Sequence, residues 1–194
     1  LGEKVKLSME KKKKHREKAN LSLPWSDFLG EKHLQYLYFQ KRKLFKVFSI
    51  GLMHPLFAIL YTYASFRAFA KAKELYPETN SNNGKGNAFR HSYWCCLIMM
   101  YFCKVSSPEK SLKWCEKLTN MHEDLFPNKP LETKMDLHNN RVGMDYFMSL
   151  VPGIHRQFFE SSFFIEELQK RTENAVLIKS VDEEVDESQL IYLE

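Results

Sequence analysis

The sequence is poor in the two residues that favour turns, with only seven glycines and seven prolines among 194 residues. All-β sandwiches and barrels need many short strands with turn signals at intervals of about 8–12 residues. The scarcity of turn residues therefore argues against such folds. Hydrophobic residues make up 44% of the chain and aromatic residues 14%, which is enough for a core and excludes a wholly disordered chain. We expect a helix-rich globular protein.

Cysteine is also scarce, and its spacing matches no zinc motif. Cys95 and Cys96 are adjacent, Cys103 lies in the same apolar run, and Cys115 stands alone. No pair has the Cys-x-x-Cys spacing of a zinc site. Buried, reduced thiols fit this pattern and indicate a reducing compartment. The start of the sequence also lacks the short apolar stretch of a secretory signal peptide. We therefore expect a cytoplasmic protein.

The positive charge is concentrated at the start of the chain. The formal net charge is +5, and residues 1–20 carry eight Lys or Arg against three Glu, which accounts for all of it. The folded part therefore lacks the basic excess of a nucleic-acid-binding surface, and we expect no strong nucleic-acid binding there. The basic segment is predicted to be a solvated, flexible leader. An arm that binds nucleic acid or an anionic membrane is the alternative.

Hydrophobic periodicity predicts a mainly α fold, a single-domain bundle of about five to six helices. Proline, serine and glycine positions place these helices at about 25–51, 55–76, 88–103, 108–126, 131–150 and 155–171. Two β-rich runs near the end, around an acidic turn, fit a small β-hairpin. The predicted organisation is a basic leader (1–22), a helical domain (23–172), and an acidic tail or small β-hairpin (173–194).

Residues 47–66 form a 20-residue stretch without formal charge. Such a stretch is long enough to cross a bilayer. However, His54-Pro55 interrupts it, and Pro55 suits the first turn of a new helix better than the middle of a membrane span. We favour a buried core helix, with contact of residues 47–66 with a membrane surface or lipid as the alternative.

Two predicted helices carry polar residues that can take part in acid–base chemistry. Arg90 and Trp94 are four residues apart and share a helix face, and His91 lies just after a loop rich in turn residues. Adjacent His122 and Glu123 suit a metal site or an acid/base pair. Each of these groups, taken alone, also fits a structural role, such as a core histidine hydrogen-bonded to a carbonyl group.

A third predicted helix carries Asp136, Asn139, Asn140 and Gly143. The spacing of four and three residues aligns Asp136, Asn140 and Gly143 on one face. Glycine inside a helix is unfavourable by about 1 kcal/mol relative to alanine, which indicates close approach of another helix or a ligand. A buried structural network of amides is the alternative to a site.

The segments Gly86-Asn-Ala-Phe-Arg-His-Ser-Tyr-Trp94, His122-Glu123 and Met135-Asp-Leu-His-Asn-Asn-Arg-Val-Gly143 occur in this order. Together they resemble a bacterial domain family of unknown function, over roughly residues 50–150. Its members typically read Asp-Ala-Phe-Arg-His-Ala-Tyr-Trp-Asn, then Ala-His-Glu, then Met-Asp-x-x-Asn-Asn-x-x-Gly. This chain departs from the pattern at Asn87, where Asp is usual, and at Cys95, where Asn is usual. The resemblance implies that the shared positions form one site, but it implies no reaction.

These residues lead us to expect a hydrolase, of phosphate or lipid esters, with a polar cluster on converging helices. The predicted catalytic residues are His91, His122, Glu123, Asp136 and Arg90, and the predicted substrate-binding residues are Trp94, Asn139 and Asn140. In one version His91, His122 and Asp136 bind a divalent metal ion that activates water. In the other a histidine activates water directly, and Arg90 binds an anionic group.

Two other functions fit the sequence. In a non-catalytic binding domain, the same cluster would be a buried structural network of the kind that specifies a fold without adding much stability. A membrane-associated module would rest on residues 47–66 and the basic leader. The sequence does not indicate an oligomeric state.

Overall fold

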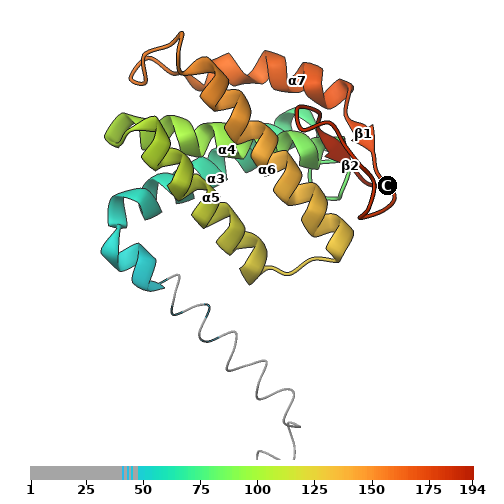
Figure 1. Cartoon of the computed structure of the whole chain (residues 1–194), viewed down its shortest axis with the longest axis horizontal. Helices are drawn as coiled ribbons and strands as arrows, with labels where there is room; N and C mark the ends of the chain where they lie inside the picture. The colour runs from blue at the N-terminus through green and yellow to red at the C-terminus, as the bar shows by residue number, and fades with distance from the viewer. Residues whose placement is uncertain (1–40, 42, 44, 46–47) are drawn as a thin grey trace, which may run out of the picture. The chain divides into compact units, whose positions relative to one another are not determined.

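The computed structural model describes residues 41, 43, 45 and 48–194 (Figure 1). The chain divides into two units, Leu1–Phe48 and Ser49–Glu194. In the first unit, residues 41, 43, 45 and 48 are helical. The predicted leader, and most of the helix predicted over residues 25–51, lie outside the described residues.

Helix α4 (Lys85–Val105) lies at the centre of this unit (Figure 1). It packs against α3 (Pro55–Leu75), α5 (Pro108–Leu125), α6 (Pro130–Leu150) and α7 (Ile165–Glu173). Sixteen of its 21 residues are buried. A helix that is apolar on all sides is expected to be enclosed by others. The mainly helical fold predicted from the sequence is confirmed.

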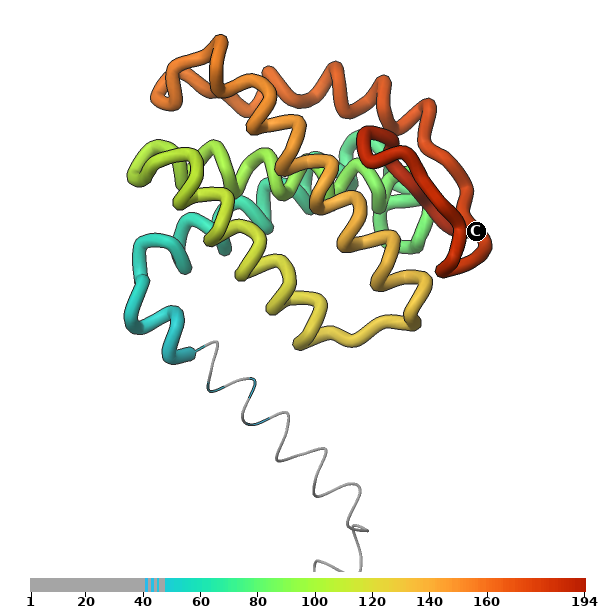
Figure 2. The backbone as a smooth tube through the Cα atoms, viewed as in Figure 1, coloured from blue at the N-terminus to red at the C-terminus, as the bar shows by residue number. Residues whose placement is uncertain are grey.

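Prolines mark the starts of three helices, as predicted for Pro55 and Pro108, whereas Pro130 was expected in the loop before its helix. The first turn of a helix contains Pro55, Pro108 or Pro130 in these three cases. Backbone N–H groups in a first turn have no partner within the helix, so the missing N–H group of proline removes no hydrogen bond there. At the start of α5, Ser107 Oγ accepts a hydrogen bond from the Lys110 N–H group at 3.3 Å. Helices α5 and α6 run in opposite directions, joined by a short loop (Figure 2).

The helix predicted over residues 155–171 is wrong in its first half. That part consists of turns and a 3₁₀-helix, η1 (Ser161–Phe164), and only α7 is α-helical. Phe159 and Phe164 both pack on Phe147, with ring centroids 4.5 and 5.8 Å from it. Residues five apart point in different directions on an α-helix. The backbone must therefore leave the α-helical path to bring both rings into the core.

The predicted C-terminal hairpin is also wrong, although two short strands are present. Strands β1 (Val176–Leu177) and β2 (Ile191–Tyr192) pair in parallel, with Val176 opposite Ile191. A hairpin would make them antiparallel. The connection between them returns the chain to the end where β1 began. Lys134 Nζ of α6 donates a hydrogen bond to the Val181 carbonyl group of this connection at 2.8 Å.

The uncharged stretch is not a buried core helix, contrary to our expectation. Within residues 48–66, only Ile50 and Ala64 are buried. The buried face of α3 consists of alanines at intervals of four, so α3 packs closely on α4 and leaves its larger side chains outside. The exposed ones include Leu56, Ile59, Tyr63 and Phe66. None of the described helices is long and apolar enough to cross a membrane.

All four cysteines are buried and free, as predicted. Three lie on α4 and one on α5. Cys96 Sγ donates a hydrogen bond to the carbonyl group of Gly143 at 3.3 Å, across the contact between α4 and α6. Burial raises the pKa of the Cys96 thiol, so this thiol serves as a small core side chain and not as a nucleophile.

Candidate functional site

The first turn of α4 is fixed by the loop that follows α3. Gly86 packs so closely on this loop that an added Cβ would lie 2.6 Å from Tyr76 Cβ and 2.7 Å from the Asn80 backbone nitrogen. Asn80 is itself buried, and its Nδ2 donates to the Tyr76 carbonyl group at 2.7 Å. A glycine is needed for this approach. The loop therefore sets the position of Arg90 and His91, one turn further along α4.

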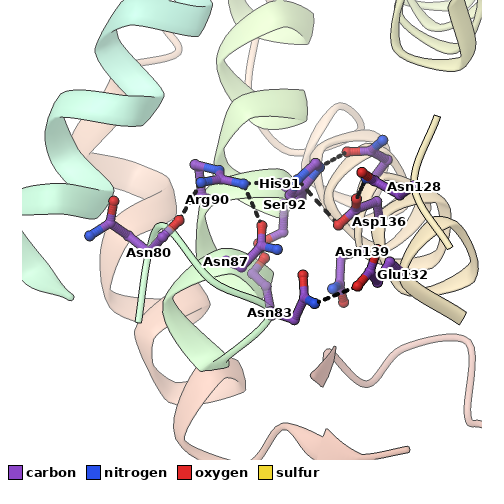
Figure 3. A network of polar contacts seen from close by, with 12 residues as sticks. Asn80, Asn83, Asn87, Arg90, His91, Ser92, Asn128, Glu132, Asp136 and Asn139 are labelled. Atoms are coloured by element: carbon purple, nitrogen blue, oxygen red, sulfur yellow. Dashed lines mark hydrogen bonds and ion pairs between the residues drawn. The ribbon is translucent and has the colours of Figure 1, made fainter. Parts of the chain in front are cut away.

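His91 is buried where α4 meets α6 (Figure 3). Its Nδ1 lies 3.1 Å from Asn140 Oδ1, and its Nε2 lies 3.3 Å from Asp136 Oδ1. Asp136 and Asn140 are four residues apart on α6, so both face the same ring. The structure thus brings together three residues that the sequence predicted to share a site.

The contacts of His91 indicate which of its ring nitrogens is basic. Asn140 Oδ1 also accepts a hydrogen bond from Cys95 Sγ, at 3.5 Å. Because this oxygen can only accept, Nδ1 of His91 carries the proton and Nε2 carries the lone pair. Burial, followed by the charge of Arg90, lowers the pKa of His91 to about 3. The ring is therefore neutral near neutral pH.

Asp136 faces this basic nitrogen. Its Oδ2 accepts a hydrogen bond from Asn128 Nδ2 at 3.1 Å. Its Oδ1 has no hydrogen-bond partner within the described part of the chain, although it lies 3.3 Å from the unprotonated Nε2 of His91. Burial raises the pKa of Asp136 to about 6. An ionised Asp136 would stabilise a proton arriving on Nε2.

Arg90 is held by uncharged groups. Nη1 donates to the Asn80 carbonyl oxygen, Nη2 donates to Asn87 Oδ1 at 2.7 Å, and Nη2 lies 3.4 Å from His91 Nε2 (Figure 3). Among the residues that the structure describes, no carboxylate forms an ion pair with Arg90. Burial lowers the pKa of Arg90. A guanidinium group has five N–H donors, so some remain for a ligand.

Glu123 is a buried carboxyl group on α5. Burial is the main cause that raises its pKa, to about 7, and the nearby charge of Asp136 adds to the effect. Its Oε1 has no hydrogen-bond partner among the described residues. Near neutral pH Glu123 is therefore protonated in part of the molecules, and it can donate a proton.

His122 and Trp94 lie beside this network. Their ring centroids are 5.2 Å apart, in an edge-on arrangement. Trp94 Nε1 donates a hydrogen bond to Ser65 Oγ of α3 at 2.8 Å, which fixes the indole ring. Burial lowers the pKa of His122, so this second imidazole is also available as a neutral base.

A pocket of about 510 Å³ opens onto these side chains. Such a volume is within the range of about 300–1,000 Å³ that is usual for small-molecule sites. No Asp or Glu belongs to its lining, as far as the described residues show. The lining combines an α3 wall with four predicted site residues: Tyr61, Thr62, Ser65, Phe66, Ala68 and Phe69 from α3, and Arg90, His91, Trp94 and His122.

The two asparagines predicted to bind substrate have other contacts. Asn139 Nδ2 donates to the Ile191 carbonyl group at 2.8 Å, and Asn139 Oδ1 accepts from the Ile191 N–H group at 3.0 Å. Its amide therefore holds β2. Asn140 orients His91. Neither residue lines the pocket, whereas Trp94 does.

The predicted metal-binding trio of His91, His122 and Asp136 is not supported by the geometry. Within the described ranges, no group of three or more His, Cys, Asp or Glu side chains is placed to hold a metal ion. We therefore favour the version of the site in which a histidine activates water directly.

Nothing in the sequence singles out Asn80, Asn128 and Ser65 as site residues, although each contacts a predicted site residue. Asn80 and Asn128 lie in loops, where asparagine is common for its turn-forming ability. Ser65 is one polar residue on an otherwise apolar helix. Their partners depend on how the helices pack, which spacing along the chain does not indicate.

A model of the family described as "Domain of unknown function (DUF6973)" matches residues 48–176. This range contains every predicted site residue, and the chain belongs to this family. No curated protein and no solved structure matches the chain.

Proposed function

We propose that the protein is a hydrolase of esters, in which His91 is the general base. The observation that carries the proposal is the position of His91. It lines the pocket, its Nδ1 is held by Asn140, and its basic Nε2 lies between Asp136 and Arg90. A base oriented by a second group and placed beside a cation is the arrangement that hydrolytic chemistry needs.

In the proposed step, Nε2 removes a proton from a water molecule while the water oxygen attacks the carbonyl carbon or the phosphorus of the ester. The bond to the leaving oxygen breaks, and the proton on Nε2 passes to that oxygen. Ester and water thus become acid and alcohol. Asp136, 3.3 Å from Nε2, stabilises the imidazolium ion between the two transfers.

Arg90 and His122 complete the proposed machinery. Arg90 lines the pocket with donors still available, and it would bind the anionic oxygen that develops on the ester. His122 would contact the substrate from the α5 side. Glu123 is outside the lining and would supply protons to the cluster, since its pKa is raised to about 7.

The test is release of acid from a panel of carboxylic esters and phosphate esters with short and long chains. We expect saturable turnover of at least one class, at rates within the common range of about 1–10³ s⁻¹. The rate should fall as the pH drops through about 6, because Asp136 then takes up a proton and no longer stabilises the imidazolium ion. If the folded protein turns over none of these esters, the proposal is wrong.

The alternative is a non-catalytic binding domain in which the cluster is a structural network. Two cluster residues connect different elements, which favours this alternative. Arg90 donates a hydrogen bond to the carbonyl group of Asn80 in the loop after α3, and Asn139 donates one to the carbonyl group of Ile191 in β2. In that case Arg90 and His91 would be needed for folding alone.

A further inference from the structure

The lining of the pocket combines aromatic side chains of α3 with one cationic side chain. The wall is formed by α3, where Phe66 and Phe69 line the pocket although they are 72% and 48% exposed to solvent. A ligand that covers such exposed aromatic side chains binds more favourably, because it removes their apolar surface from water. The same lining includes the cationic side chain of Arg90, together with His91 and His122.

Arg90, the cation of the lining, forms no ion pair with a carboxylate within the described part of the chain. The hydrogen-bond partners of Arg90 are a carbonyl oxygen, an amide oxygen and a ring nitrogen, all neutral. The charges of Asp136 and Glu123 act on Arg90, but neither acid forms an ion pair with it in the described structure, and neither lines the pocket. An arginine in a partly desolvated site favours a carboxylate or phosphate as its partner.

We propose that this pocket binds an amphiphile with an anionic head group, the head on Arg90 and the apolar chain along α3. The shared chemistry of the head is a phosphate or carboxylate next to an apolar chain. The inference rests on the proposed function in taking this amphiphile as the substrate class, but binding itself requires no turnover.

The exposed face of α3 extends the apolar wall beyond the pocket. Leu56, Ile59, Tyr63 and Phe66 follow at intervals of three and four residues, which places them in one row. Phe66 belongs both to this row and to the lining. A chain longer than the pocket would therefore continue over apolar side chains instead of entering water.

Calorimetry with monomeric dodecyl phosphate tests this inference, with dodecanoate, dodecanol, dodecyltrimethylammonium and inorganic phosphate for comparison. Because dodecyl phosphate is itself a phosphate ester, release of inorganic phosphate is measured in the same samples, so that binding is separated from turnover. We expect the two anionic amphiphiles to bind at least about tenfold more tightly than the others. Phe66→Ser should weaken dodecyl phosphate binding several-fold. Phe158→Ser is the matched control, because Phe158 is also 72% exposed but does not line the pocket.

The charge at the head is tested by Arg90→Gln, which should remove the preference for dodecyl phosphate over dodecanol. If Arg90→Gln does not fold, the comparison of head groups in the unaltered protein decides instead. Equal binding of dodecanol and dodecyl phosphate, or an unchanged affinity in Phe66→Ser, would overturn the inference. Binding to phosphatidylglycerol vesicles without binding of monomers would overturn it too, since the lipid would then contact a surface and not the pocket.

The two proposals fail in different ways. Binding of dodecyl phosphate by a protein that hydrolyses no ester supports the pocket and contradicts the hydrolase. Hydrolysis of short, water-soluble esters without binding of any amphiphile supports the hydrolase and contradicts the pocket assignment.

Discussion

Replacing Gly143 with alanine is expected to destabilise the fold by about 3 kcal/mol or more, at the upper end of the usual range for overpacking. Gly143 lies on α6 where this helix crosses α4. A Cβ at this position would lie 2.3 Å from the Ser92 carbonyl oxygen and 2.7 Å from Ser92 Cα. These are backbone atoms in the middle of the central helix, so no side-chain rotation relieves the clash. The two helices would have to move apart.

Denaturant unfolding measures this effect. Gly153→Ala is the matched control, because the nearest atom to its added Cβ is 3.8 Å away, an ordinary contact. We expect the control to change the free energy of unfolding by less than about 0.5 kcal/mol. A Gly143→Ala protein as stable as the control would show that α4 and α6 do not approach as closely as described.

His91→Gln is expected to lower the rate of ester hydrolysis by about 10²–10⁴-fold, the usual contribution of a general base. Glutamine has a similar length and can still donate to Asn140, but it cannot take up a proton. The loss of stability should stay near 1–2 kcal/mol, on the order of one buried hydrogen bond. Activity and unfolding are measured on the same preparation.

His155→Gln is the control for this variant, because His155 is exposed and lies outside the pocket. Its activity should equal that of the unaltered protein. Full activity in His91→Gln would exclude His91 as the base. An unfolded His91→Gln protein would instead support the structural network.

The sequence predicted the helices well where local chemistry decides. Pro55 and Pro108 start helices because proline suits a first turn, wherever the helix packs. Prediction from the sequence failed for features that depend on how the helices pack against one another. The 20-residue uncharged stretch indicated burial, but α3 buries only a narrow face of alanines. The strand pair is parallel and not a hairpin, and its connection and second strand accept hydrogen bonds from Lys134 and Asn139 of α6, which lie far away in the sequence.

The candidate site was predicted in the same uneven way. Asp136 and Asn140 share a helix face, so their joint contact with His91 follows from spacing once α4 and α6 meet. The sequence could not separate Asn139, which holds β2, from Asn140, which holds His91, because adjacent residues differ only in the direction they face. The pocket was not predictable, because its lining combines residues of α3 with residues of α4 and α5 that come together only when the helices pack.

The central claim is that His91 is a neutral base and not one half of a structural ion pair with Asp136. Nuclear magnetic resonance of the protein with ¹⁵N-labelled histidine measures this directly, with His91→Gln to assign the signals. At neutral pH we predict a neutral imidazole protonated on Nδ1, with a pKa well below the ordinary value of 6.5. A His91 ring that is protonated on both nitrogens at neutral pH would contradict the account.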